Sequence, residues 1–599
     1  MPAIKATTFD GIYPRTSPTM LADNQAQVAQ NVKLYSQELR YWNGPTSVQS
    51  LTIIPKTIYK LYDVANINPA IWLTWTNVVD VAPGPLGDTV DSRVYYTGDP
   101  TPRKTNYALA TSGAAPYPFN YYELGVPAPT GAPTVTATVA GTGIAETRAY
   151  VYTYIHQFGA LMEESAPSPA ASVTVNTVGS TVTINGFTTP PAGKYNWLSR
   201  RIYRSVTGGT TTSYQFVAEI PLATTSYADT LTVAGLGVVL PSLGWLPPPT
   251  GLQGIVSMAN GSGALCGFVG NTVYFSEPFY AHAWPLKYAM TVPYPIIGLQ
   301  IFGTTVVVMT DRNPYLINGG TPGIMSLERL PMVEPCVSKG SIVTDESGVT
   351  YASPNGLVTI GYSVRAVVTT SLFTRDEWQA LTPGQIKATV LNGRYFGVYP
   401  DQSNSNKAFI INTRDRPAMS NITMPASAVY VDSKTASVFY AHQTDKNIYQ
   451  LDADTANPLT YEWRSKRWQL PHATTFSVMR VDADYTSFTD VTAYNANAAA
   501  IIAANQALFA GNLKGAFDSV PMNTYTFNGS VMTNNPSFAT TRNITVIILA
   551  DDVPVASIQP TSFDPIRMPP FKARTLEIKI LGNANVRSVV VATHVSELD

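Results

Sequence analysis

The chain has 599 residues; 45% are hydrophobic, only 13% are charged, and the formal net charge is −1 at pH 7. This length accommodates several domains, and the charged fraction is about half of the ~25% usual in soluble domains. Because the chain has no run of five or more Lys and Arg residues, its composition argues against nucleic-acid binding through phosphate neutralisation. Low charge instead suits a β-rich protein whose surface is used up by neighbours in an assembly.

Cysteine content and hydropathy indicate the cellular compartment in which the protein is made. Cys266 and Cys336 are too few for a disulfide framework, and we expect two isolated buried thiols, with a single bond between them as the alternative. Residues 1–5 lack the apolar stretch of a signal peptide, and the longest apolar runs, near Val306 and Ile544, are far shorter than a membrane helix. We therefore expect a soluble protein made in a cytoplasm.

Residues 1–127 combine one short helix with several strands. Asp23 is suited to cap a helix that ends near Asn31 and carries the apolar residues Ala26, Val28 and Ala29. Alternating apolar and polar residues then predict three strands, at 57–63, 70–75 and 93–97. We interpret this region as the N-terminal part and the first strands of a propeller.

Residues 128–247 form a separate unit between two proline-rich segments, 126–133 and 245–251. Short alternating strands at sandwich spacing predict an inserted fibronectin-III-like or immunoglobulin-like β-sandwich, hung on stiff proline-rich arms. In the strand over 148–155 we expect three tyrosines to share one face: Tyr150, Tyr152 and Tyr154.

Residues 248–484 contain a weak internal repeat. Strand-like segments, each preceded by a turn, recur at intervals of roughly 33–46 residues. They begin near residues 271, 304, 348, 393 and 436. Four-stranded propeller blades repeat at about this period, so we predict an all-β fold with a β-propeller-like body; an irregular stack of β-hairpins is the alternative. The strands in 542–599 are expected to close the propeller.

Residues 485–541 interrupt the β pattern with a helical insertion and a loop. Small, nearly uncharged side chains predict one long helix over 489–510, about 20 residues and roughly 30 Å long. Such side chains allow close packing on more than one face. The partner of this helix is either the rest of the same subunit or a neighbouring subunit.

No pattern in the sequence indicates catalysis, a cofactor or a metal ion. The five histidines are scattered, without a zinc-binding or nucleophile motif. They are His156, His282, His442, His472 and His594. The pairs Asp452/Asp454 and Asp482/Asp484 lack the glycine and distal glutamate of a calcium loop, so we interpret them as turn carboxylates. We therefore name no catalytic, cofactor-binding or metal-ligating residue.

Two pairs of adjacent carboxylates, Glu163–Glu164 and Asp551–Asp552, would serve as acid and base only if both members faced one substrate. Adjacent strand residues point to opposite faces, so neither pair suits that role. A propeller glycosidase with carboxylates from different blades, and sugar-binding platforms of tryptophans, stay as alternatives. We expect the tryptophans to fill cores: Trp42, Trp72, Trp75, Trp284, Trp463 and Trp468.

Short motifs are spread in order along nearly the whole chain. The N-terminal ones are Gly11-Ile-Tyr-Pro, Ala26-Gln-Val-Ala-Gln-Asn-Val-Lys-Leu and Tyr96-Thr-Gly-Asp-Pro-Thr-Pro-Arg-Lys-Thr105. The insert adds Glu163-Glu-Ser-Ala-Pro-Ser-Pro169 and Arg201-Ile-Tyr-Arg-Ser. The later ones are Val273-Tyr-Phe-Ser-Glu-Pro with Trp284-Pro, Tyr461-Glu-Trp-Arg-Ser-Lys-Arg-Trp468 and Glu577-Ile-Lys-Ile-Leu-Gly582. Together this set resembles the tail nozzle (head–tail stabilisation) proteins of short-tailed, podovirus-like bacteriophages.

The resemblance implies a non-enzymatic virion protein without cofactors or a membrane span. It implies a propeller-like subunit in a ring of six copies below the adaptor and portal, assembled in the host bacterial cytoplasm as a conduit for DNA retention and ejection. The implied partners are copies of the chain, the adaptor and portal proteins, tail fibres or spikes, and genomic DNA passing non-specifically through the lumen. A host-receptor-binding adhesin or tail spike protein is the alternative.

Overall fold

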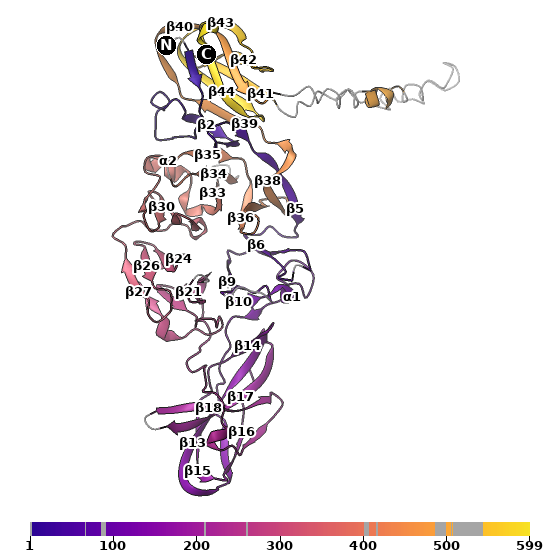
Figure 1. Cartoon of the computed structure of the whole chain (residues 1–599), viewed down its shortest axis with the longest axis vertical. Coiled ribbons are helices and arrows are strands. Elements are labelled where there is room, and N and C mark those ends of the chain that lie inside the picture. Colours follow the sequence, from indigo (N-terminus) through magenta and orange to yellow (C-terminus); the bar gives the residue numbers. More distant parts are fainter. Residues whose placement is uncertain are drawn as a thin grey trace, which may run out of the picture.

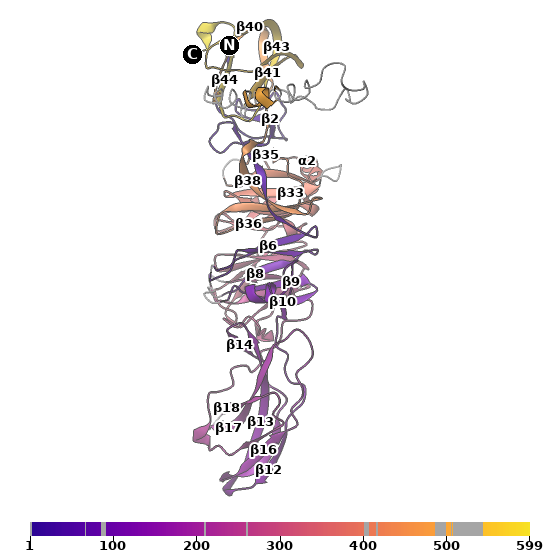
Figure 2. The ribbon, with the colours of Figure 1, turned by 90° about the vertical axis from the view of Figure 1, so that its right-hand side faces the viewer.

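The computed structural model describes residues 3–65, 67–85, 91–208, 211–258, 261–400, 406–414, 417–485, 499–504, 506 and 543–598. These residues are mostly β-strand and form an elongated molecule with three parts: a terminal domain, a ring of β-units and a β-sandwich (Figure 1). The view turned by 90° shows the three parts in a line (Figure 2). The terminal domain and the sandwich therefore lie at opposite ends of the molecule.

Within the described residues the ring contains one two-stranded and six four-stranded units. The first three are β6 (Thr57–Leu61) with β7 (Ile71–Trp75); β8 (Asp80–Pro83), β9 (Val94–Asp99), β10 (Thr101–Thr105) and β11 (Tyr122–Glu123); and β20 (Gln253–Ser257), β21 (Leu265–Val269), β22 (Thr272–Phe275) and β23 (Met290–Thr291). The fourth and fifth are β24 (Ile296–Phe302), β25 (Thr305–Thr310), β26 (Tyr315–Asn318) and β27 (Ser326–Arg329); and β28 (Val343–Asp345), β29 (Gly348–Ser353), β30 (Gly356–Ile360) and β31 (Arg365–Val367). The last two are β32 (Lys387–Leu391), β33 (Arg394–Pro400), β34 (Asn406–Ile411) and β35 (Met419–Ile422); and β36 (Ala426–Asp432), β37 (Ser437–His442), β38 (Asn447–Pro458) and β5 (Asn43–Ser50).

The units close on themselves into a propeller-like ring. Their first strands contact one another in the order β8, β20, β24, β28, β32, β36 and β6. The β6–β7 hairpin completes the circle: Trp75 packs with Tyr96 of the next unit on one side, and Trp72 packs with Phe439 of β37 on the other. This closed order is incompatible with an irregular stack of β-hairpins.

The strand that closes the ring comes from the N-terminal region. Strand β5 pairs antiparallel with β38, so that Ser50 lies opposite Asn447. The prediction that 542–599 closes the propeller is therefore wrong. Those residues form β41 (Ile544–Ala550), β42 (Val553–Ile558), β43 (Ile566–Gly582) and β44 (Val586–Ala592), and they pair in the terminal domain instead. Alternating residues specify that a strand forms, but its partner is chosen by the whole fold.

The terminal domain joins both ends of the chain. Strand β1 (Ala3–Ala6) pairs with β44, which places Ala3 opposite Ala592. Strand β44 pairs in turn with β40 (Trp468–Ala483), and β40 pairs with β43. The small hairpin β3 (Val32–Lys33) and β4 (Arg40–Tyr41) follows β2 in the chain.

A continuous sheet links the terminal domain to the ring. Strand β2 (Ala26–Gln30) pairs with β39 (Tyr461–Ser465) of the terminal domain on one side and with β35 of the ring on the other. The helix predicted from Asp23 to Asn31 is thus wrong. Ala26 and Ala29 are buried in the hydrophobic core as part of strand β2. Pairing on both edges of this strand outweighs the local helical pattern.

The helix predicted over 489–510 lies mostly outside the described residues. Residues 499–504 are helical and largely exposed, so this described part is not buried in the core of the subunit. No long helix occurs in the part of the chain that the structure describes. Two further short α-helices there are α1 (Tyr107–Ala110) and α2 (Arg375–Ala380).

The insert is a sandwich of two sheets. One contains β12 (Thr134–Val139), β16 (Thr181–Asn185) and β19 (Ser226–Asp229). The other contains β14 (Leu161–Glu164), β13 (Thr142–Phe158), β17 (Trp197–Gly208) and β18 (Thr211–Pro221), with β15 (Ala171–Val178) beside β13. The three tyrosines predicted to share a face, Tyr150, Tyr152 and Tyr154, are all buried in the core between the sheets.

Candidate functional site: the joints between the three domains

The sandwich enters the ring with a β-hairpin. Strand β13 runs for 17 residues and turns at Gly159 into β14, and its last residue, Phe158, is fully buried. The Phe158 ring packs in a cluster with Tyr95 of β9 and with Trp284, which follows β22. The backbone N–H of Ala160 donates to the Asp91 carboxylate at 2.9 Å. The β13–β14 hairpin of the insert therefore packs against the ring, so the proline-rich segments are not the only attachment of the insert.

A buried cluster of charged and imidazole groups lies beside this hairpin. Lys104 of β10 forms an ion pair with Glu163 of β14, and the two side chains are 0% and 2% exposed. His156 Nδ1 of β13 lies 3.0 Å from Glu163 Oε2. From the ring, His282 Nδ1 lies 3.9 Å from Glu163 Oε1, and its Nε2 lies 3.2 Å from the backbone oxygen of Glu164. One carboxylate of the sandwich thus faces two segments of the ring.

The protonation states follow from burial and from the ion pair. Burial raises the pKa of Glu163, but the Lys104 ammonium and the His156 hydrogen bond outweigh this, and the pKa falls to about 2. Burial lowers the pKa of His282 to about 4 and also lowers the pKa of His156. Burial lowers the pKa of Lys104 too, an effect that the Glu163 carboxylate counters in part. Near pH 7 the joint therefore holds one ion pair and two neutral imidazoles.

The neighbouring carboxylate, Glu164, faces the other way. It accepts hydrogen bonds from Thr153 Oγ1 and Tyr203 Oη, each at 2.7 Å, and pairs with Arg201 at 2.9 Å. This confirms that the two adjacent glutamates do not face one site. A cavity of about 60 Å³ adjoins the joint, between Tyr95, Glu163 and His282. This volume is far below the roughly 300–1,000 Å³ of small-molecule sites.

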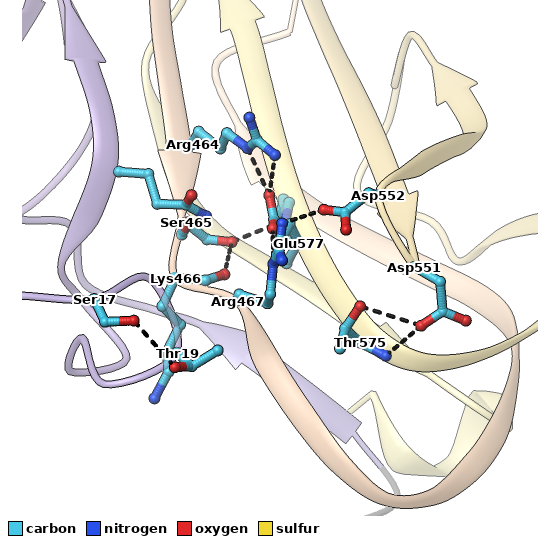
Figure 3. A network of polar contacts seen from close by, with 12 residues as sticks. Ser17, Thr19, Arg464, Ser465, Lys466, Arg467, Asp551, Asp552, Thr575 and Glu577 are labelled. Atoms are coloured by element: carbon cyan, nitrogen blue, oxygen red, sulfur yellow. Dashed lines mark hydrogen bonds and ion pairs between the residues drawn. The ribbon is translucent and has the colours of Figure 1, made fainter.

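A second polar network lies within the terminal domain, beside the strand β39 that leads to the ring (Figure 3). Glu577 of β43, 3% exposed at its side chain, accepts from Arg464 Nε at 2.5 Å and from Arg467 Nε at 2.6 Å. Arg467 also pairs with Asp552, in the turn between β41 and β42. The hydroxyl of Ser465 accepts from the Ile578 N–H at 2.9 Å. This network holds β39 against β43, and β39 is the strand that pairs with β2.

The other carboxylates singled out in the sequence have separate partners. Asp551 accepts from the Thr575 N–H at 2.8 Å, while Asp552 pairs with Arg467, so this second adjacent pair also diverges. Asp452 pairs with Lys33 at 2.5 Å, and Asp482 pairs with Arg587 at 3.2 Å.

The interpretation as turn carboxylates is wrong for Asp452 and Asp454, which lie within β38, and for Asp482, which lies within β40, because strand pairing by distant segments extends through them. The remaining carboxylates and histidines lie apart from the joint at Lys104. Asp454 accepts from Asn457 Nδ2 at 2.7 Å, and Asp484 pairs with Arg587. His442 Nδ1 accepts from the Thr444 N–H at 3.2 Å, and His472 and His594 are exposed. In the described ranges no group of three or more His, Cys, Asp and Glu side chains could hold a metal ion.

The expected apolar residues occupy cores. Cys266 and Cys336 are free, buried thiols, as predicted. Five of the six tryptophans are buried, and Trp468 packs partly buried against the terminal core. Of the helices that the structure describes, none has the length and hydropathy to cross a membrane. Sequence reasoning missed the joint at Lys104 because Lys104 and Glu163 are 59 residues apart; the only available signal was a lysine within a strand of a charge-poor chain.

Comparisons with known proteins identify no relative. No family model matches the chain, and neither does any curated protein. Among solved structures, the N-terminal domain of Nup159 aligns at 9% identity and a TM-score of 0.21, covering 42% of this chain and 86% of that one. The extracellular domain of the one-component system BT4673 from B. thetaiotaomicron aligns at 10% identity and a TM-score of 0.22, covering 56% of this chain and 42% of that one. Alignments with such TM-scores support no inference about function.

Proposed function

We propose that the chain is a structural protein of a bacteriophage tail and forms the ring-shaped nozzle below the portal and adaptor, the conduit through which DNA is retained and then ejected. The observation that carries this proposal is the alignment of three β-domains in one line, held by a buried ion pair between sandwich and ring and by a continuous sheet between ring and terminal domain. The joint at Lys104 resists bending because moving the sandwich would separate a buried charge from its partner.

Several of the motifs that resemble nozzle proteins contain residues of the Lys104 joint or of the Glu577 network. The Tyr96–Thr105 motif contains Lys104, and the Glu163–Pro169 motif begins with its ion-pair partner. The Tyr461–Trp468 motif contains both arginines that bind Glu577, the first residue of another motif. Part of the resemblance therefore rests on residues that hold elements of the subunit together, which supports a structural role. We also propose that the insert is a fibronectin-III-like domain.

Assembly is the decisive test. The full chain would be purified alone and with the adaptor and portal proteins, and its mass would be measured by analytical ultracentrifugation, with electron microscopy of the complex. We expect a closed ring of six copies around a hollow axis, coaxial with the portal. Finding only monomers of the chain, both alone and with the adaptor and portal proteins, would overturn the proposal.

A further inference from the structure

The end of the sandwich furthest from the ring is an apolar tip. We define the distal tip as residues 138–145 and 176–181, which lie side by side because Thr142 pairs with Val178 and Val139 pairs with Thr181. Its aliphatic side chains are exposed: Val139 to 51%, Ile144 to 79% and Val178 to 62%. Strands β12 and β15 end here and strands β13 and β16 begin here, at the extremity of the elongated molecule (Figures 1 and 2).

The distal tip carries no charge. Residues 124–145 and 165–193 contain no Asp, Glu, Lys, Arg or His. The nearest charged residue, Glu146, pairs with Arg148 at 2.5 Å. Hydroxyl groups surround the tip, as in the contact between Thr138 and Thr183 at 3.2 Å. The surface thus changes from apolar at its end to hydroxyl-rich beside it.

The backbone of the distal tip is bonded internally. The Asn176 N–H donates to Ala140 O at 2.9 Å, and Asn176 Nδ2 donates to Gly141 O at 2.9 Å. The Ile144 N–H donates to Thr177 Oγ1 at 3.2 Å. A segment that leaves water must satisfy its backbone polar groups in this way, because hydrocarbon offers them no partner.

We propose that the distal tip inserts its three aliphatic side chains into the surface of a phospholipid bilayer. A protruding tip suits a deformable planar partner better than it suits a peptide, which needs a groove. The absence of charge means that binding requires no anionic lipid. Three short aliphatic side chains give a weak partition, on the order of that of one acyl chain at 10⁴ M⁻¹. The inference does not depend on the proposed ring, although several copies in one assembly would strengthen binding.

Vesicle flotation of the full chain tests this proposal. The probes are phosphatidylcholine vesicles and vesicles of phosphatidylcholine mixed with phosphatidylglycerol, at low and high salt. The variant Ile144→Asp is matched by Ile324→Asp in the ring, because both isoleucines are 79% exposed. We expect the wild-type chain and Ile324→Asp to float equally on both vesicles at both salt concentrations. Ile144→Asp should lower the bound fraction by about tenfold, since it removes one apolar side chain from the contact.

Three outcomes would overturn the proposal: no flotation of the wild-type chain, equal flotation of Ile144→Asp, or flotation that needs the anionic lipid. Binding to host cells that depends on Ile144 without flotation would also overturn it and would point to a protein or glycan receptor. Thermal unfolding of both variants checks that each is folded. Because the assay needs no ring, its failure is distinguishable from a failure of the nozzle proposal.

Discussion

Lys104 of the ring and Glu163 of the sandwich form an ion pair from which water is almost wholly excluded. The pair fixes the direction of the insert, since each charge has lost its water shell and depends on the other. Breaking such a pair by removing one partner is far more costly than removing both.

Lys104→Met should therefore destabilise the chain by about 3–5 kcal/mol, because it leaves Glu163 buried without its cation. The double variant Lys104→Met with Glu163→Gln should recover most of that loss. Guanidinium denaturation of the full chain measures both. Arg365→Met is the control: Arg365 and Glu328 are both more than 40% exposed, so the cost should stay below about 1 kcal/mol. Equal losses in the single and double variants would contradict the assignment.

Acid should loosen the same joint. The pKa of His282 is lowered to about 4 in the folded chain from 6.5, so the unfolded chain binds more protons between these values. The contribution of His282 to stability should be constant above pH 6.5 and fall by about 3 kcal/mol as the pH drops to 4. Glu163, with a pKa of about 2, adds a further loss below pH 4.5. Unfolding temperatures measured against pH test this, and His282→Asn should make the profile shallower between pH 6.5 and 4, where the lowered pKa of His156 still contributes.

Phe158→Ala should weaken the contact between the β13–β14 hairpin of the sandwich and the ring. Removing a fully buried phenylalanine costs about 3–5 kcal/mol, here at the contact between two domains. We expect faster proteolysis in the proline-rich segment at 245–251 and a broader distribution of dimensions in X-ray scattering. The control is Phe563→Ala, at a residue that is 52% exposed in the terminal domain. An unchanged cleavage rate for Phe158→Ala would show that the prolines alone hold the insert.

Gly11→Ala should weaken the joint between the terminal domain and the ring. A Cβ at Gly11 would lie 2.5 Å from the Met419 oxygen, which accepts from the Ile12 N–H at 2.7 Å. Relieving that overlap should cost about 1–3 kcal/mol. Gly320→Ala is matched to it, because nothing lies within 4 Å of the added Cβ. Thermal unfolding should show a lower transition temperature only for Gly11→Ala.

The sequence alone determined the local features of this fold. Alternation predicted the strands of the sandwich and the inward face of Tyr150, Tyr152 and Tyr154. The repeat located ring strands, although its first segment corresponds to β22, the third strand of its unit, while the next corresponds to β25, a second strand. These features follow from the two-residue period of a strand, which depends on neighbouring residues only.

Only the tertiary structure decided which segments meet. Residues 26–30 became a strand instead of a helix because β39 and β35 offered pairing on both edges. Strand β5, not the C-terminal strands, closed the ring, and Lys104 met Glu163 across a domain boundary. Partner choice depends on the total packing and on the burial of polar groups by distant segments, and neither quantity is encoded in a local pattern.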